Sequence, residues 1–185
     1  MSMRHIQEQA LYNAICSADC ADKANTIVYG EQGGARAESD STWVQSSMNR
    51  LEQAFDDATV KQIRMRCQCG YGMPERVELL NELKGASSSL EEFAGSERAL
   101  TAGLYCENGE LYLKFPFCPC PMLSSVDRLP SKTWCQCTTG YSKVLFEQVF
   151  GCPVDVELLK SIKAGDDICL MKITLDGFDW SSREQ

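Results

Sequence analysis

Apolar residues recur at helical spacing through most of the first hundred residues of the chain. Residues 6–18 show this pattern, and residues 39–64 show it more strongly. The apolar stripe of the second segment consists of Val44, Met48, Leu51, Phe55 and Ala58. Residues 74–85 and 87–95 are shorter, and each combines an N-terminal helix signal with a closing glycine. The spacing therefore predicts a mainly helical N-terminal part, interrupted by a Gly-rich loop over residues 24–39.

The pattern then changes to alternation of apolar and polar residues. An Asn-Gly pair at residues 108–109 separates two alternating runs, which is the composition of a type I′ β-hairpin. A two-residue loop pairs Leu104 with Leu113 on one face of the hairpin. On the other face it pairs Tyr105 with Tyr112, so both faces support the same register.

A helix and a second hairpin follow. Residues 138–151 carry an apolar helical face and end at a glycine suited to a C-cap. Residues 153–159 and 168–175 alternate as half-buried strands do, and the turn sequence KAGDD joins them. We therefore expect an α+β fold, in which a helical N-terminal half packs on a four-stranded antiparallel sheet made of two hairpins that flank a helix.

The length of the chain suits one domain with a substantial core. We expect a single domain over residues 1–185, with a mainly helical part at 1–100 and a hairpin-loop-helix-hairpin part at 101–176. Homodimers are common for domains of this kind, so a homodimer is also expected.

The formal net charge of −8 makes nucleic acid an improbable partner, because binding to DNA or RNA draws on Lys and Arg contacts to phosphate. The longest basic cluster is the short run at 61–66. No stretch of 18 apolar residues and no signal-peptide pattern occur, so the sequence predicts a cytoplasmic protein without a membrane span.

Eleven cysteines are about twice the usual number for a chain of this size. Six of them form three Cys-x-Cys pairs: Cys67 and Cys69, Cys118 and Cys120, Cys135 and Cys137. The second pair lies among prolines that restrict the backbone, and the third lies at a predicted helix start, where the helix dipole favours thiolate. The second and third pairs together would make a Cys₄ set, which the first pair could extend. Such a set suits zinc, with an iron–sulfur cluster as second choice.

Two other interpretations of these cysteines stay open. One is a thiol-dependent enzyme or redox protein that uses a cysteine of lowered pKa, with Cys135 or Cys137 as the best candidates. The other is that the cysteines are small buried hydrophobic residues of the core. Because His5 is the single histidine, the sequence offers no Ser-His-Asp or Cys-His arrangement in the C-terminal half.

The last forty residues resemble the end of the 4-vinyl reductase (V4R) small-molecule-binding domain family and related cysteine-rich bacterial proteins. The positions that carry the resemblance are Gly140, Val154, Val156, Glu157, Gly165, Cys169 and Ile173. One cysteine of the family pattern, expected near residues 161–162, is absent. The resemblance implies an α+β fold with a pocket for a small, often apolar ligand between the sheet and the helices. Aromatic candidates for lining such a pocket are Trp134, Tyr141, Phe115 and Phe146.

Overall fold

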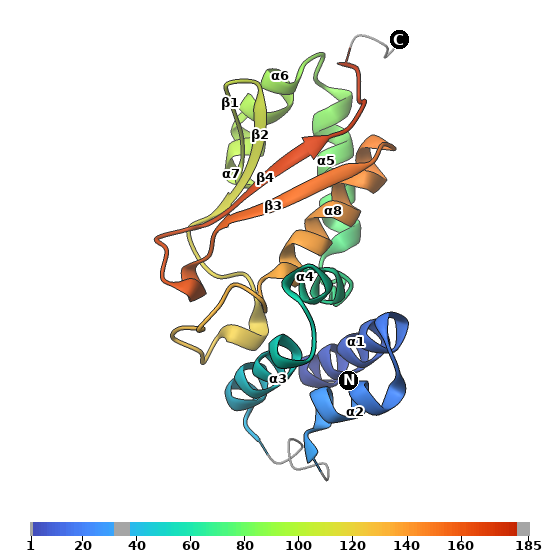
Figure 1. Ribbon diagram of the computed structural model, residues 1–185. Coiled ribbons are helices and arrows are strands. Elements are labelled where there is room, and N and C mark those ends of the chain that lie inside the picture. Colours follow the sequence, from blue (N-terminus) through green and yellow to red (C-terminus); the bar gives the residue numbers. More distant parts are fainter. Residues whose placement is uncertain (1, 32–37, 181–185) are drawn as a thin grey trace.

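The computed structural model describes residues 2–31 and 38–180, which form helices and one antiparallel sheet (Figure 1). The helices are α1 (Met3–Ala18), α2 (Ala21–Tyr29), α3 (Asp40–Ala54), α4 (Asp57–Met65), α5 (Met73–Gly85), α6 (Leu90–Gly95), α7 (Glu97–Thr101) and α8 (Gln136–Phe150). The strands are β1 (Leu104–Glu107), β2 (Glu110–Phe115), β3 (Val154–Lys160) and β4 (Cys169–Leu175). Short 3₁₀ turns, η2 (Pro121–Leu123) and η3 (Ile162–Ala164), lie in the loops. The predicted α+β fold with a four-stranded antiparallel sheet is confirmed.

Two predictions in the N-terminal part were wrong in detail. The segment expected as a loop from residue 24 contains most of α2, and the rest of that loop, residues 32–37, lies outside the described residues. The long helix predicted from residue 39 is two helices, because Phe55 is extended and the Asp56 carboxylate accepts a hydrogen bond from the Thr59 amide (3.0 Å) and caps α4. The apolar stripe therefore ends in the partly buried Phe55, and Ala58 is exposed.

The register of the first hairpin is the predicted one. Leu104 lies opposite Leu113, and Tyr105 lies opposite Tyr112 with its ring stacked on that of its partner at 5.1 Å between centroids. Asn108 has a φ of 53°, the left-handed conformation that a type I′ turn requires. The second hairpin joins the first through β2 and β4, which gives the strand order β1-β2-β4-β3.

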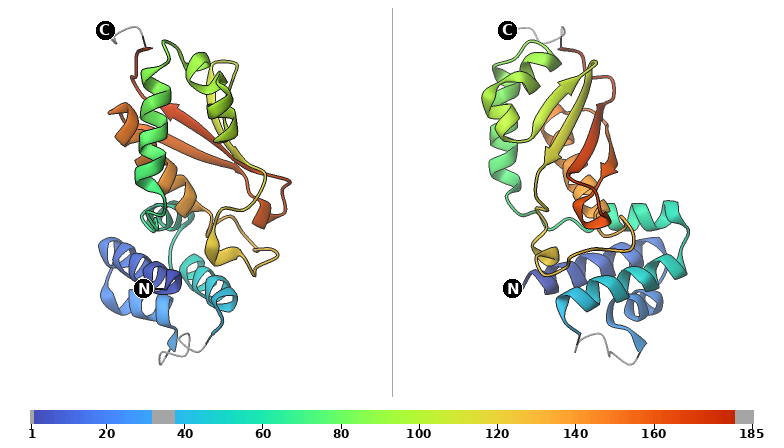
Figure 2. Two further views of the ribbon diagram at one scale, coloured as in Figure 1. Left: turned by 180° about the vertical axis from the view of Figure 1, so that it is seen from behind. Right: turned by 90° about the vertical axis from the view of Figure 1, so that its left-hand side faces the viewer.

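Helices cover one face of the sheet. Figure 2 shows α5 and α8 together on that face. With α6, α7 and the sheet, these helices enclose a core that includes Leu80, Phe93, Leu145 and Met171. The opposite face carries polar residues such as Asp155. This arrangement follows from the alternation along β2, β4 and the first half of β3, since successive side chains point to opposite faces.

A second core lies at the other end of the molecule. It is built from α1 to α4 and from the long loop between β2 and α8, which contributes Met122, Leu123 and Trp134. Helices α1–α3 therefore lie beyond the end of the sheet and do not cover it, as Figure 1 shows. The sequence-based expectation that the whole helical half packs on the sheet holds for α5–α7 only. None of the helices in the described part of the chain is long and apolar enough to cross a membrane.

Helices α4 and α8 bring the two cores together through one glycine. A Cβ atom placed on Gly140 would lie 1.8 Å from the carbonyl oxygen of Met65. The helices can therefore approach this closely only because residue 140 has no side chain.

Candidate functional site

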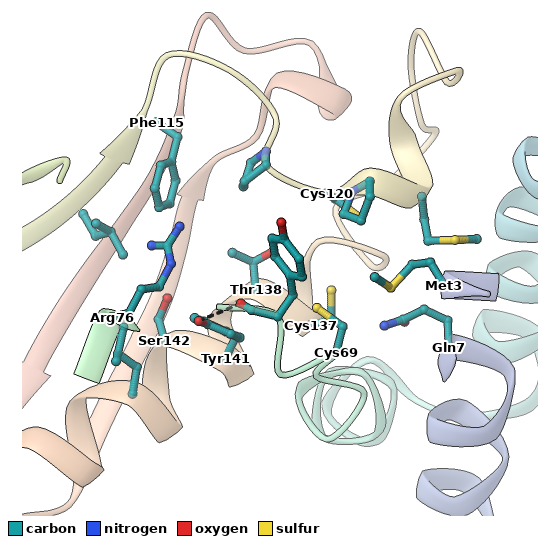
Figure 3. A pocket seen from close by; sticks show the side chains of 16 residues that line it. Met3, Gln7, Cys69, Arg76, Phe115, Cys120, Cys137, Thr138, Tyr141 and Ser142 are labelled. Atoms are coloured by element: carbon teal, nitrogen blue, oxygen red, sulfur yellow. Dashed lines mark hydrogen bonds between the residues drawn. The ribbon is translucent and has the colours of Figure 1, made fainter. Parts of the chain in front are cut away.

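An apolar cavity lies where the two cores meet. It has a volume of about 100 Å³, and we call it the central pocket (Figure 3). Its walls come from α1, α5, β2, α8 and the loops around them, so residues far apart in the sequence surround one space. The lining residues are Met3, Gln7, Cys69, Tyr71, Arg76, Leu113, Phe115, Pro119, Cys120, Pro121, Met122, Cys137, Thr138, Tyr141, Ser142 and Leu145.

Each Cys-x-Cys pair contributes one thiol to the central pocket. These cysteines are Cys69, Cys120 and Cys137. In the third pair the two thiols diverge because Cys135 is the N-cap of α8 and Cys137 lies within the helix, where residues two apart do not face the same side. The sequence-based expectation that both members of a pair share one site therefore does not hold for the third pair, in which only Cys137 lines the central pocket, or for the first pair, in which only Cys69 does.

A smaller cavity of about 20 Å³ lies directly beside the central pocket, and we call it the thiol cavity. Four cysteines line it, and Pro119, Cys120 and Thr138 form a wall that it shares with the central pocket. The complete lining is Cys118, Pro119, Cys120, Leu123, Trp134, Cys135, Thr138, Leu158, Ser161, Cys169 and Met171. The predicted four-cysteine set therefore changes in one member, with Cys169 in place of Cys137.

The loop that supplies Cys118 and Cys120 is held by local contacts. Pro119 and Pro121 restrict the backbone on both sides of Cys120, which precedes the η2 turn. The indole Nε1 of Trp134 donates a hydrogen bond to Cys120 Sγ at 3.4 Å. Cys135 Sγ lies 3.2 Å from Ser161 Oγ, which places the start of α8 against the end of β3.

All eleven cysteines are described and none forms a disulfide. Among the residues of 2–31 and 38–180, no three His, Cys, Asp or Glu side chains converge closely enough to hold a metal ion as they stand. The four thiols of the thiol cavity therefore lie around one small space without converging on a common centre, and those of Cys120 and Cys135 are hydrogen-bonded to Trp134 and Ser161.

Burial controls the acidity of these thiols. It raises the pKa of Cys118 and of Cys169, and it raises the pKa of Cys135 to about 11. The thiol of Cys137 is surrounded by protein although the residue is partly exposed, and burial raises its pKa to about 12. These directions are opposite to the lowered pKa that the helix start predicts for Cys135 and Cys137, because loss of hydration outweighs the dipole of α8.

Arg64 places a positive charge inside the protein near this cluster. Its side chain is fully buried, donates from Nη2 to the backbone oxygen of Trp134 (3.0 Å) and lies over the Trp134 ring at 4.2 Å. Its Nε and Nη1 have no hydrogen-bonding partner among the described residues. The charge lowers the pKa of Cys67 and Cys137, against the larger effect of burial.

Of the four aromatic residues predicted to line a ligand pocket, two lie at the central pocket and two lie elsewhere. Tyr141 and Phe115 line the central pocket, and Tyr141 Oη donates to the backbone oxygen of Tyr71 (3.0 Å). Trp134 lines the thiol cavity instead, with its ring edge-on to Trp43. Phe146 is fully buried in the core of the sheet, where it stacks on Phe150, and does not reach the pocket.

Cys67, predicted as a metal ligand, is also part of the core. It is fully buried, and its thiol donates to the Ile63 oxygen at 3.2 Å. Two pocket residues, Gln7 and Arg76, are absent from the sequence-based predictions. Both are polar residues within helices, and nothing in their local sequence distinguishes them from solvated positions.

Comparisons with known proteins identify a family but no activity. A family model described as a family of unknown function (DUF6144) matches residues 1–180. No curated protein and no solved structure matches the chain. The comparisons do not test the resemblance to V4R domains, which stays a prediction.

Proposed function

The chain belongs to the family of unknown function DUF6144, and we propose that it is a cytoplasmic, V4R-like small-molecule-binding protein in which the thiol cavity holds a soft metal ion beside the ligand pocket. One observation carries the proposal. Four thiols from the β2–α8 loop, the start of α8 and β4 surround one cavity of about 20 Å³, which shares a wall with an apolar pocket of about 100 Å³.

The chemistry of the four sulfur atoms favours a metal. Their positions are near enough for Cys118, Cys120 and Cys169 each to raise the pKa of Cys135, so the thiols oppose one another's ionisation. A divalent ion reverses this effect, since it binds thiolates and releases their protons. Zinc accepts four thiolates at about 2.3 Å in a tetrahedron, and rotation of the cysteine side chains would bring the sulfur atoms inward.

The size of the cavity favours a single ion over a cluster. A volume of about 20 Å³ suits one atom with its ligands, whereas an iron–sulfur cluster contains several metal and sulfide atoms. Zinc is therefore the proposed metal, and the iron–sulfur alternative is decided by the same experiment. The buried charge of Arg64 would offset part of the net negative charge of a four-thiolate centre.

The test is the metal and thiol content of protein purified without oxygen. We expect one zinc per chain and four thiols that react with a thiol reagent only after chelator removes the metal, in addition to the thiols of Cys67 and Cys137, which the fold itself buries. Cys118→Ser and Cys135→Ser should each lose the metal. The matched control is Cys106→Ser, since Cys106 lies on β1 outside both cavities.

Other results would change or end the proposal. Iron with acid-labile sulfide, lost in the same two variants, would replace zinc with a cluster. Absence of any metal, with thiol reactivity that chelator does not change, would refute the metal centre. Metal that persists in Cys118→Ser and Cys135→Ser but is lost in Cys137→Ser would move the centre to the central pocket and refute the ligand set.

A further inference from the structure

The central pocket is electrostatically one-sided. Among its described lining residues Arg76 is the single charged side chain, and no Asp or Glu is present. This is unusual for a chain with a net charge of −8, in which acidic residues outnumber basic ones. The pocket therefore has no carboxylate among its described lining residues to repel an anionic ligand, and it has the guanidinium of Arg76 to attract one.

Arg76 has no partner for its charge. Its side chain is partly buried, and the guanidinium forms no hydrogen bond or ion pair with any residue that the structure describes. Its guanidinium carbon lies 5.8 Å from the centre of the Phe115 ring and 5.9 Å from that of Tyr141. The two rings hold the guanidinium at the pocket wall while its N–H groups stay available, and a guanidinium fork matches the two oxygens of a carboxylate.

Gln7 offers the second unfulfilled group. The residue is 3% exposed, and its Nε2 donates to the backbone oxygen of Cys67 at 3.2 Å. That bond leaves the acceptor Oε1 as the unpartnered atom of a side chain that lines the pocket. Oε1 is buried and has no hydrogen-bonding partner among the described residues. A buried acceptor without a donor is costly, and a ligand that donates to it would recover this free energy.

The two groups lie on opposite sides of the pocket. Figure 3 shows Arg76 on one side and Gln7 on the other, with Tyr141 between them. The remaining wall consists largely of apolar side chains and of the thiols of Cys69, Cys120 and Cys137. The phenol of Tyr141 already donates to Tyr71 and does not compete for the ligand.

We propose that the ligand of the central pocket is a small organic carboxylate that carries a hydroxyl or N–H donor at the end remote from its carboxylate, separated by an apolar body. The carboxylate binds Arg76, and the donor binds Gln7 Oε1. This inference rests on the proposed small-molecule function and specifies its ligand class. It does not require the metal centre, because neither Arg76 nor Gln7 lines the thiol cavity.

The experiment uses titration calorimetry to measure the binding of one series of ligands that differ in chain length and in end groups. The probes are ω-hydroxyalkanoates of about four to eight carbons, the corresponding alkanoates and the corresponding diols, sizes that suit a small cavity. We expect the hydroxy acids to bind tightest. Removal of the hydroxyl should weaken binding roughly fivefold, and replacement of the carboxylate should weaken it roughly ten- to a hundredfold, the usual values for a neutral and a charged hydrogen bond.

Two variants separate the contacts. Arg76→Met should remove the preference for acids over diols, and Gln7→Met should remove the preference for hydroxy acids over plain acids. The matched control is Arg98→Met, since Arg98 is an exposed arginine on α7 outside the pocket. Metal content and unfolding midpoint are measured on each sample, so a variant that fails to fold is recognised. In that case the relative affinities of the unaltered protein for hydroxy acids, plain acids and diols still test the inference.

Three outcomes would overturn the inference. They are equal affinity for acids and diols in the unaltered protein, an unchanged acid preference in Arg76→Met, and no binding by any carboxylate of the series. A protein that binds metal and fails these tests loses the ligand class only. A protein that binds hydroxy acids without metal keeps the ligand class and loses the metal centre.

Discussion

The close approach of α4 and α8 makes Gly140→Ala the most informative single substitution. The new methyl group would lie 1.8 Å from the carbonyl oxygen of Met65 and 2.6 Å and 2.7 Å from its carbonyl carbon and Cα. All three are backbone atoms, so no side-chain rotation relieves the contact, and α4 must move away from α8. Because Cys69 follows α4 and Cys137 lies on α8, the same movement changes the central pocket.

The expected magnitude combines two opposing effects. Overpacking of a protein interior costs about 1–3 kcal/mol, and a contact with backbone belongs at the upper end, ~3 kcal/mol. Alanine is favoured over glycine within a helix by about 1 kcal/mol. The net loss in the free energy of unfolding is therefore about 2 kcal/mol, which lowers the midpoint of thermal unfolding by roughly 4–8 °C for a chain of this size.

Urea unfolding followed by circular dichroism measures this loss. The matched control is Gly85→Ala at the end of α5, where no atom lies within 4 Å of the added Cβ and the residue is exposed. The control should be neutral or slightly stabilising. If Gly140→Ala were as stable as Gly85→Ala, the helices would be free to separate, and the explanation of how the two cores meet would be refuted.

Three further predictions concern the rest of the fold. Trp180→Ala should reduce the free energy of unfolding because the ring of Trp180 packs 5.8 Å from that of Phe150. The residue is partly buried, so the expected loss is about 2 kcal/mol, less than for a fully buried aromatic residue. An unchanged urea midpoint would show that the C-terminal segment is not part of the core. Asn108→Ala should cost about 1 kcal/mol in the same assay, since alanine is strained at a φ of 53°, while Asn108→Gly should be neutral; equal losses in both would contradict a type I′ turn. The pKa values of Cys135 and Cys137 in the fold, about 11 and about 12, lie above the ordinary 9.0, so the metal-free protein should be fully stable below pH 9 and lose stability as the pH rises toward 12. Urea midpoints across that range test this, and a midpoint that rises with pH would contradict the burial of these thiols.

Local interactions explain why several elements were predictable. The register of the first hairpin depends on a two-residue turn, and Asn108 needs no distant partner to adopt its conformation. The alternation of apolar and polar residues in β3 and β4 likewise predicts which side chains are buried. The break at Asp56 was missed because the apolar spacing continues through it, and the competing signal is a single capping carboxylate.

The sequence alone determined the α+β class, both hairpins, the helix from which Cys137 projects, and the presence of three cysteine pairs in one chain. Tertiary structure alone decided which thiols meet. It separated Cys137 from Cys135 and Cys69 from Cys67, brought Cys169 on β4 to the cavity of Cys118, Cys120 and Cys135, and placed Arg76 and Gln7 on opposite sides of one pocket. The physical reason is that a secondary-structure element follows from contacts between neighbours in sequence, whereas a cavity is the space left where separate elements pack, and its lining depends on how closely α4 approaches α8 at Gly140.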